Sequence, residues 1–440
     1  MTERVRSIVA RGEQLAMSAD RVAVVIIIIG VALRCWWVLS ASVGTIDDSA
    51  FYNGHAVDLA AGRGYLNPAT GAPSAFLPPG YSLALAAVYL VTGPSVLAGA
   101  VLNVAFAVVT MVFTYLIARR AFGTGAARLA TVILAAFPSQ IVYTPALTPD
   151  LFFTMLVMAV LWAGLVISAE TGRARFLLLG ILLGVAVLTA PKVLVLAPLL
   201  VFAASREVPR RVAARRSAYV LVTMLVLLIP WTVRNAIQLD APVFVSTNSG
   251  VNLWIGSNPE ATGGWMPWDP NSDGWTYPED EIATDREFRQ RAVDYVFDHP
   301  LDWLKLTRPK LEETFRQDFS YLGHFSLVTR DKPLPGWMPG GRLRRIVNAY
   351  YDVICWAAVA GVLVLIAKRN AASISLVVAV VLLILPVVLF FGLDRYHVVV
   401  LPLFCILAAG GAAILARDVR TRIDPPRKTD PRPPRPGSAR

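Results

Sequence analysis

Residues 45–81 read TIDDSAFYNGHAVDLAAGRGYLNPATGAPSAFLPPGY and directly follow the first long apolar block of the chain. Two adjacent carboxylates, Asp47 and Asp48, therefore stand where a hydrophobic helix would meet water. From 48 to 61 apolar side chains recur at helical spacing, which predicts a short helix lying on the membrane surface. The run 81–91 is apolar but too short to cross a bilayer, and it predicts a second interfacial or re-entrant helix.

Apolar blocks of this kind recur along the whole chain. Of the 440 residues, 56% are hydrophobic and only 16% are charged, whereas soluble proteins have about a quarter charged residues. The blocks are long enough to cross the roughly 30 Å of hydrocarbon in a bilayer. The sequence predicts an all-α polytopic membrane protein with about ten transmembrane helices. The candidate spans are 21–43, 95–118, 126–143, 150–168, 176–190, 193–205, 217–233, 346–367, 372–391 and 398–416.

Basic residues gather in alternate connections between these spans, as in the segment 206–216. Since cytoplasmic loops carry an excess of Lys and Arg, these connections and both termini are predicted to be cytoplasmic, in a plasma membrane. The net charge of +11 then reflects the excess of Lys and Arg in the predicted cytoplasmic segments, and it does not indicate nucleic-acid binding. The predicted parts are a cytoplasmic N-terminus (1–20), an N-terminal transmembrane region (21–233) with a first outer loop (44–94), a small extracytoplasmic loop domain (234–345), C-terminal transmembrane helices (346–416) and a disordered basic cytoplasmic tail (417–440).

Three carboxylates on the predicted outer side are candidates for chemistry. Asp47 and Asp48 either cap the interfacial helix or supply a general base for a hydroxyl nucleophile, and one residue can do each. Asp150 opens the fourth span after Pro149, either as a helix cap or as a second carboxylate that meets Asp47. The scattered histidines and the three cysteines inside apolar blocks show no metal-ligand spacing. An acidic pair can still bind a divalent cation such as Mg²⁺ or Mn²⁺, although nothing in the sequence requires a cofactor.

Three cations also stand at outer ends of spans, where the topology does not favour them: Lys192, Arg234 and Arg395. Together they suit a phosphate or pyrophosphate head group, although Asp394 leaves a local ion pair with Arg395 as an alternative. Arg34 lies deep in the first span and is interpreted as structural. The sequence shows no Gly-rich phosphate loop and no nucleotide domain, so a sugar donor would have to arrive in the membrane on a lipid phosphate.

The motifs with these residues are DDSAFY (47–52), GRGY (62–65), PPGY (78–81), LTPDLF (147–152), PWTVRN (230–235), STNSGVNLWIGSNP (246–259), DHP (298–300) and DRY (394–396). In order and placement they resemble the GT-C membrane glycosyltransferases, in the branch of protein O-mannosyltransferases and the lipid A aminoarabinose transferase. The resemblance covers most of residues 20–416.

This resemblance implies inverting transfer from a polyprenyl-phosphate sugar to a lipid, glycan or protein hydroxyl on the outer face. Asp47 then corresponds to the base or acceptor-orienting residue, Asp150 to the second acidic residue near the site, and Arg395 to a basic residue that is a candidate ligand of the lipid phosphate. Relatives often have a basic residue just before the Pro-Pro turn, where Phe76 and Leu77 stand here, and an arginine where Ala190 stands. Contact with the phosphate then falls to Lys192, Arg63 or Arg234. The expected acceptor- or sugar-binding residues are Tyr52, His55, Tyr81, Asn248, Asn252 and Tyr396.

Two other classes of protein fit the same composition. A transporter or flippase of lipid-linked sugars would have internal repeats with broken helices in matching halves, and the sequence shows no such repeats. An inactive scaffold of the same fold would have no need of Asp47, Asp150 and Arg395. The sequence leaves the sugar and the acceptor open.

Overall fold

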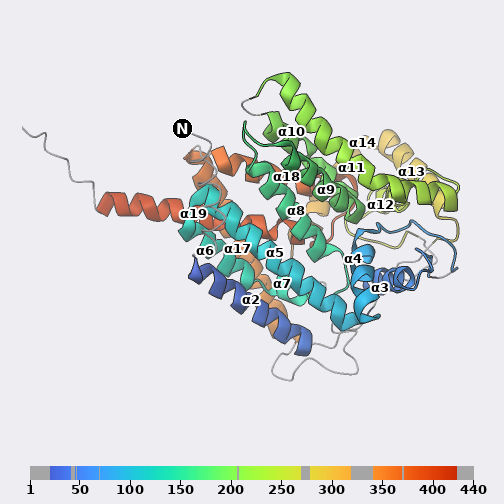
Figure 1. Ribbon diagram of the computed structural model, residues 1–440, viewed down its shortest axis with the longest axis horizontal. Coiled ribbons are helices and arrows are strands. Elements are labelled where there is room, and N and C mark those ends of the chain that lie inside the picture. The colour runs from blue at the N-terminus through green and yellow to red at the C-terminus, as the bar shows by residue number, and fades with distance from the viewer. Residues whose placement is uncertain are drawn as a thin grey trace, which may run out of the picture.

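The computed structural model describes residues 20–40, 45, 47–68, 70–205, 208–268, 278–318, 340–368 and 371–423, and every regular element within these ranges is a helix (Figure 1). The transmembrane part contains α2 (Arg21–Ser40), α5 (Val96–Phe122), α6 (Thr124–Ala135), α7 (Pro138–Val142), α8 (Asp150–Leu165), α9 (Arg173–Thr189), η1 (Pro191–Leu196), α10 (Ala197–Ser205), α11 (Arg210–Gln238), α17 (Gly340–Ala367), α18 (Ala371–Leu389), η3 (Asp394–Val400) and α19 (Leu401–Ile423). The prediction of an all-helical membrane protein is confirmed. The predicted tail lies mostly outside the described residues, and α19 runs on to Ile423.

In the described ranges five helical stretches are long and apolar enough to cross a membrane: four lie in α2, α5, α11 and α17, and the fifth runs from η3 into α19. The other candidate spans correspond to shorter apolar helices, so the number of crossings stays a prediction. The candidate span 126–143 is two helices, because Pro138 starts a new helix after Phe137, whose ψ of 115° is extended. A residue before proline is pushed out of the helical region, which explains the break.

Small residues bring the spanning helices into close contact. α9 packs along α11 through Gly180 and Gly184, and a Cβ atom on Gly180 would lie 2.7 Å from the carbonyl oxygen of Val220. α17 packs along α19, where a Cβ on Gly411 would lie 2.4 Å from the Cα of Gly361. Since lipid tails are as apolar as leucine, such close backbone packing is what holds membrane helices together.

Arg34 is a fully buried cation in α2, with 1% of its surface exposed. Its guanidinium donates hydrogen bonds to the carbonyl oxygens of Gly30 (2.9 Å), Ala135 (3.0 Å) and Leu134 (3.3 Å). The last two carbonyls belong to the C-terminal turn of α6, where carbonyl groups have no i+4 partner within the helix. Arg34 therefore joins α2 to α6, which agrees with the prediction that it has a structural role.

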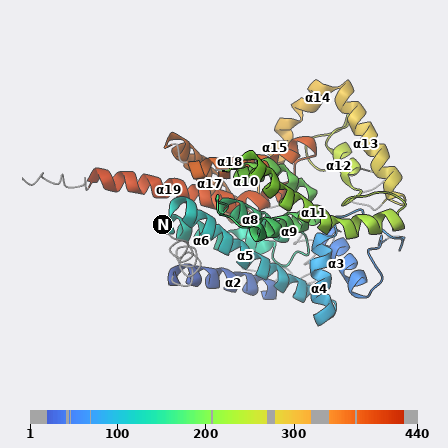
Figure 2. The same cartoon turned by 45° about the horizontal axis from the view of Figure 1, so that its top comes forward.

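Ion pairs tie the helix ends together at one end of the bundle. Asp20 accepts hydrogen bonds from Arg128 (2.9 Å) and from the Tyr115 hydroxyl (2.5 Å), and Lys368 pairs with Asp418 (2.6 Å). Figures 1 and 2 show the start of α2 and the end of α19 at this end. The short helices of the first outer loop and of the loop domain lie at the opposite end.

Those short helices begin with α3 (Asp47–Ala60) and α4 (Gly80–Thr92), which agree with the two interfacial helices that the sequence predicts. α3 ends at Ala60, and Gly62 in the turn that follows has a φ of 72°, which suits glycine. The loop domain adds α12 (Ser249–Ile255), α13 (Glu281–Asp298), α14 (Pro300–Lys305) and α15 (Thr307–Phe315). Asp280 caps α13 by accepting hydrogen bonds from the backbone N–H groups of Ile282 and Ala283.

Candidate active site

A cavity of about 560 Å³ lies where α3, α8, η1, α18, η3 and the loop before α12 meet. This volume is within the range of ligand pockets, roughly 300–1,000 Å³. Eight of the residues that the sequence singled out line it: Asp48, Tyr52, Asp150, Lys192, Asn248, Asn252, Arg395 and Tyr396. These residues come from separate parts of the chain, and the fold alone brings them together.

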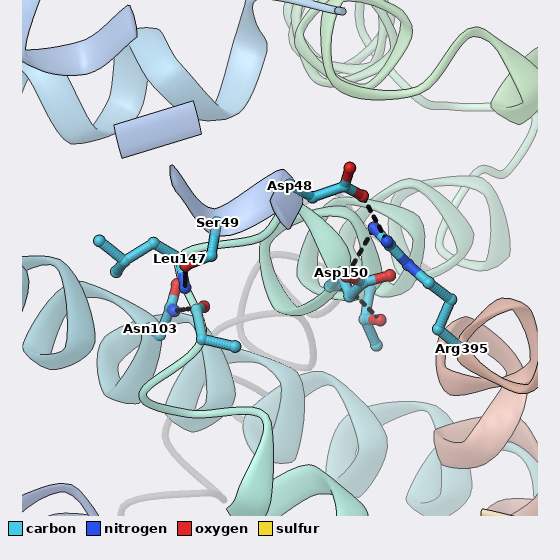
Figure 3. Close-up of polar contacts among 8 residues, drawn as sticks. Asp48, Ser49, Asn103, Leu147, Asp150 and Arg395 are labelled. Atoms are coloured by element: carbon cyan, nitrogen blue, oxygen red, sulfur yellow. Dashed lines mark hydrogen bonds and ion pairs between the residues drawn. The ribbon is translucent and has the colours of Figure 1, made fainter. Parts of the chain in front are cut away.

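Arg395 bridges two of the candidate carboxylates across this cavity (Figure 3). Its Nη1 donates to Asp48 Oδ2 at 2.5 Å, and its Nη2 donates to Asp150 Oδ2 at 3.3 Å. Asp48 lies in the first turn of α3 and Asp150 is the first residue of α8, where helix dipoles favour negative charge. All three side chains are less than a third exposed. Arg395 is thus paired across the fold, with carboxylates that lie hundreds of residues earlier.

The turn that leads into α8 is fixed from behind the cavity wall. The backbone N–H of Leu147 donates to Ser49 Oγ at 3.2 Å, and Asn103 Nδ2 donates to the carbonyl oxygen of Ala146 at 2.7 Å (Figure 3). Tyr81 is fully buried, and its hydroxyl bonds to Asn103 Oδ1 at 3.0 Å. Tyr81 therefore supports the wall from outside the lining.

Lys192 brings a second cation to the cavity. It follows Pro191 in η1, and its Nζ lies 4.6 Å from the ring centroid of Tyr396 and 5.4 Å from that of Phe153. Both aromatic rings also line the cavity. Cation–π contacts hold an ammonium without neutralising it, so Lys192 can still attract an anion.

The remaining lining residues divide into a polar and an apolar wall. The segment around α12 contributes the uncharged polar side chains Ser246, Asn248, Ser249 and Asn252. α18 and the residue after it contribute Leu383, Pro386, Val387 and Phe390. The polar wall suits the hydroxyl groups of a sugar or an acceptor. The apolar wall suits a hydrocarbon chain.

Several of the predicted site residues lie elsewhere in the fold. Arg63 pairs with Asp58 at 2.6 Å, and its side chain is 54% exposed. Arg234 donates to the carbonyl oxygens of Ser74 (2.6 Å) and Tyr65 (2.7 Å). His55 is buried and stacks on Tyr65 at 3.9 Å between ring centroids, and burial lowers its pKa to about 4.

Asp47 is the first residue of α3, and its side chain lies outside the described part of the structure. Its place next to Asp48 puts its backbone at the edge of the cavity. The role of Asp47 remains a proposal.

A buried carboxylate joins the first outer loop to the loop domain. Glu281 Oε2 accepts from the Ser74 hydroxyl, and Glu281 Oε1 accepts from the Ala75 N–H, both at 2.7 Å. Burial raises the pKa of Glu281, because the carboxylate is removed from water. This contact fixes the chain just before Leu77 and Pro78, which line the cavity.

The Glu281 contact predicts a pH-dependent effect on stability. Because the folded pKa is raised, the stability contributed by this carboxyl is fully present below its unfolded pKa and is lost as the pH rises through the folded pKa. A Glu281→Gln variant keeps an acceptor for Ala75 and a partner for Ser74 but cannot ionise. We therefore expect its melting temperature, relative to wild type, to rise as the pH increases from the unfolded pKa of glutamate, about 4.3, through the raised folded pKa. An offset that stays constant across this range would contradict the assignment.

A buried His–Asp contact escaped the sequence analysis. His397 Nε2 lies 2.9 Å from Asp318 Oδ1, and its Nδ1 lies 2.6 Å from the carbonyl oxygen of Thr314. The contact anchors η3, which also contains Arg395, to the end of α15. The partners are 79 residues apart in sequence, and no local pattern marks such a pair.

Aromatic residues and the α18 wall were missed as well. Tyr143, Phe153 and Phe390 line the cavity but look like ordinary core residues in the sequence. Pro386 interrupts the apolar run of α18 and was the one visible signal there. Among the described residues no group of three or more His, Cys, Asp or Glu side chains is placed to hold a metal ion.

The fold and the cavity define a class of polytopic helical membrane protein with a charged pocket at one end. Residues 77–233 match the family described as dolichyl-phosphate-mannose-protein mannosyltransferase. The structure is similar to the apo oligosaccharyltransferase of Archaeoglobus fulgidus, with a TM-score of 0.54 and 13% identity over 93% of this chain and 52% of that one. The same enzyme in complex with an inhibitory peptide and a dolichol-phosphate gives a TM-score of 0.53 and 14% identity, again over 93% and 52%.

ArnT from Cupriavidus metallidurans bound to undecaprenyl phosphate is similar with a TM-score of 0.41 and 16% identity over 90% of this chain and 78% of that one. A search of curated proteins gave no match. The chain spans about half the length of the oligosaccharyltransferase structures. The family match over residues 77–233 and the similar fold support the resemblance to the GT-C membrane glycosyltransferases that the motifs predicted.

Proposed function

We propose that the protein is an inverting glycosyltransferase that moves a sugar from a polyprenyl-phosphate donor to a hydroxyl group of a lipid, glycan or protein. The bridge from Arg395 to Asp48 and Asp150 in a cavity with a second cation is the observation that carries this proposal. It brings carboxylates and cations together in one pocket. Hydroxyl activation and phosphate departure both need such groups.

The walls of the cavity suit a donor with two chemically different parts. A polyprenyl chain would lie along the apolar residues of α18, and its phosphate would meet Lys192 and Arg395. The sugar would then reach the polar segment with Asn248 and Asn252. The family description names a dolichyl-phosphate sugar, and the similar oligosaccharyltransferase has been solved with a dolichol-phosphate, which supports a lipid phosphate here.

The reaction would be a single displacement at the anomeric carbon. The acceptor hydroxyl gives its proton to a carboxylate, which we assign to Asp47, and its oxygen attacks the face opposite the phosphate. The bond between the anomeric carbon and the phosphate oxygen breaks, and the lipid phosphate leaves with the bonding electrons. Arg395 and Lys192 stabilise the negative charge on that phosphate, and the anomeric configuration is inverted.

We also propose that the cavity end of the bundle faces the outside of the plasma membrane and that both termini are cytoplasmic. The basic side chains at the opposite end, such as Arg128 and Lys368, support this orientation. Nucleotide sugars are cytoplasmic, so a site on the outer side would need a lipid-linked donor.

The donor class can be tested with purified protein in lipid nanodiscs. Radiolabelled polyprenyl-phosphate mannose and other polyprenyl-phosphate sugars are compared with the corresponding nucleotide sugars, in the presence of extracted membrane lipids, glycans and proteins as acceptors. We expect label to move from the lipid phosphate to an acceptor, with release of free polyprenyl phosphate, and no transfer from the nucleotide sugar. A Glu287→Gln variant, changed in an exposed ion pair with Arg291 on α13, serves as a matched control with wild-type activity.

The same donors in proteoliposomes separate the two remaining classes. If the labelled lipid crosses the bilayer unchanged, the protein is a transporter and the proposal fails. Transfer from the nucleotide sugar alone would also contradict it.

A further inference from the structure

The corner between α13 and α14 presents an apolar surface away from the protein. Phe297 is 80% exposed, Leu301 is 71% exposed and Leu304 is 57% exposed. These positions follow the i, i+4, i+7 spacing of one helical face, although the helix is interrupted between Asp298 and Pro300. Large apolar side chains clustered in a segment outside the spans mark an interaction surface.

The following helix is held firmly against the bundle, so the corner has a fixed direction. Leu311 and Phe315 of α15 pack on the main hydrophobic core. Lys310 is fully buried, and its Nζ donates to the carbonyl oxygen of Val388 at 2.9 Å. α15 therefore turns one face to α18, and the apolar side chains of the corner lie on the side away from this contact.

The position of the corner along the bundle indicates which partner meets its exposed apolar side chains. In both views α14 lies at the same level along the long axis as α3 and α4, on another side of the molecule (Figures 1 and 2). In Figure 1 α19 runs along this axis, whereas α2 and α5 run at a slant to it. α4 also exposes apolar side chains at this level, with Leu90 70% and Val91 87% exposed. Apolar side chains at one level on separate sides of a membrane bundle are expected to meet the same lipid surface.

The polar residues of the corner fit the same position. Lys305 pairs with Asp302 at 2.6 Å and Arg308 pairs with Glu312 at 2.7 Å, and all four side chains are more than half exposed. An interfacial helix keeps charged groups in the headgroup region and places its apolar face at the acyl boundary.

We propose that the α13–α14 corner inserts Phe297, Leu301 and Leu304 into the bilayer interface at the cavity end of the protein. The partner is the phospholipid surface itself. Asp285, earlier on α13, accepts a hydrogen bond from the backbone N–H of Gly250 at 2.6 Å, next to the cavity-lining Ser249. Contact between the corner and the lipid would therefore restrain α13, the helix that supports the polar wall of the cavity.

The proposal can be tested by site-directed fluorescence in nanodiscs. In a background where Cys35, Cys355 and Cys405 are replaced, Leu301→Cys is labelled with an environment-sensitive fluorophore. We expect blue-shifted emission that is quenched by phosphatidylcholine with a nitroxide on its acyl chain and protected from aqueous iodide. A Glu287→Cys label, about 15 Å along α13 from Phe297, is the matched control and should show the opposite pattern.

Two outcomes would overturn the proposal. Iodide quenching at position 301 without nitroxide quenching would place the corner in water. Protection from both quenchers would mean that protein covers it, for example a second copy of this chain. Phe297→Cys and Leu304→Cys give the same readout if the first variant is not recovered as a folded protein, and none of these sites lines the cavity.

Discussion

Replacing Asp47 by asparagine is expected to lower sugar transfer by about two to four orders of magnitude, the usual contribution of a general base. Asparagine has nearly the same shape as aspartate but cannot take a proton from the acceptor hydroxyl. The carboxylates of Asp48 and Asp150 both accept hydrogen bonds from Arg395, so Asp47 is the neighbouring carboxylate assigned to proton transfer. The measurement is the rate of transfer from labelled polyprenyl-phosphate sugar at saturating donor.

Two further variants, Asp48→Asn and Glu287→Gln, serve as comparisons for Asp47→Asn. Asp48→Asn weakens the bridge to Arg395 but keeps the proposed base, so we expect a smaller loss than for Asp47→Asn. Glu287→Gln changes an exposed ion pair on α13 and should transfer like wild type. If Asp47→Asn transfers like wild type while Asp48→Asn or Asp150→Asn is inactive, Asp47 is only an N-terminal helix residue and the base is one of the other two.

Much of the cavity could be predicted from the sequence because helix ends in a membrane protein are ordered by topology. Asp48, Asp150, Lys192 and Arg395 each stand at the end of an apolar run on the side where basic residues are scarce. That argument fixes a depth along the membrane normal. It does not fix the position across the bundle.

The lateral position depends on packing, and this explains the residues that lie elsewhere. Arg234 stands at the same end of the bundle as Arg395, yet it donates to backbone carbonyls of residues 65 and 74. The predicted span 126–143 is interrupted at Pro138, because proline restricts the backbone of the residue before it even within an apolar run. The pair of His397 and Asp318 depends on a contact between remote segments that no spacing in the sequence records.

Replacing Arg395 by alanine is expected to lower the transfer rate by about 10²–10³-fold, the usual loss when one preorganised donor to a developing charge is removed. The variant loses a ligand for the departing phosphate and leaves Asp48 and Asp150 without their shared cation. Arg395→Lys keeps the charge but not the fork that reaches both carboxylates, so its rate should lie between those of alanine and wild type. Arg316→Ala, which removes an exposed pair with Glu313, is the matched control and should leave the rate unchanged.

A second pair of measurements separates the two effects of this arginine. Unpaired carboxylates in a partly buried site lower stability, so Arg395→Ala should also lower the melting temperature. Adding Asp150→Asn to Arg395→Ala removes one of the two negative charges and should restore part of that stability. Transfer should stay low in this double variant, because no guanidinium remains to meet the phosphate and Asn cannot replace it. If the double variant regains activity together with stability, Arg395 only neutralises the carboxylates, and phosphate binding then falls to Lys192.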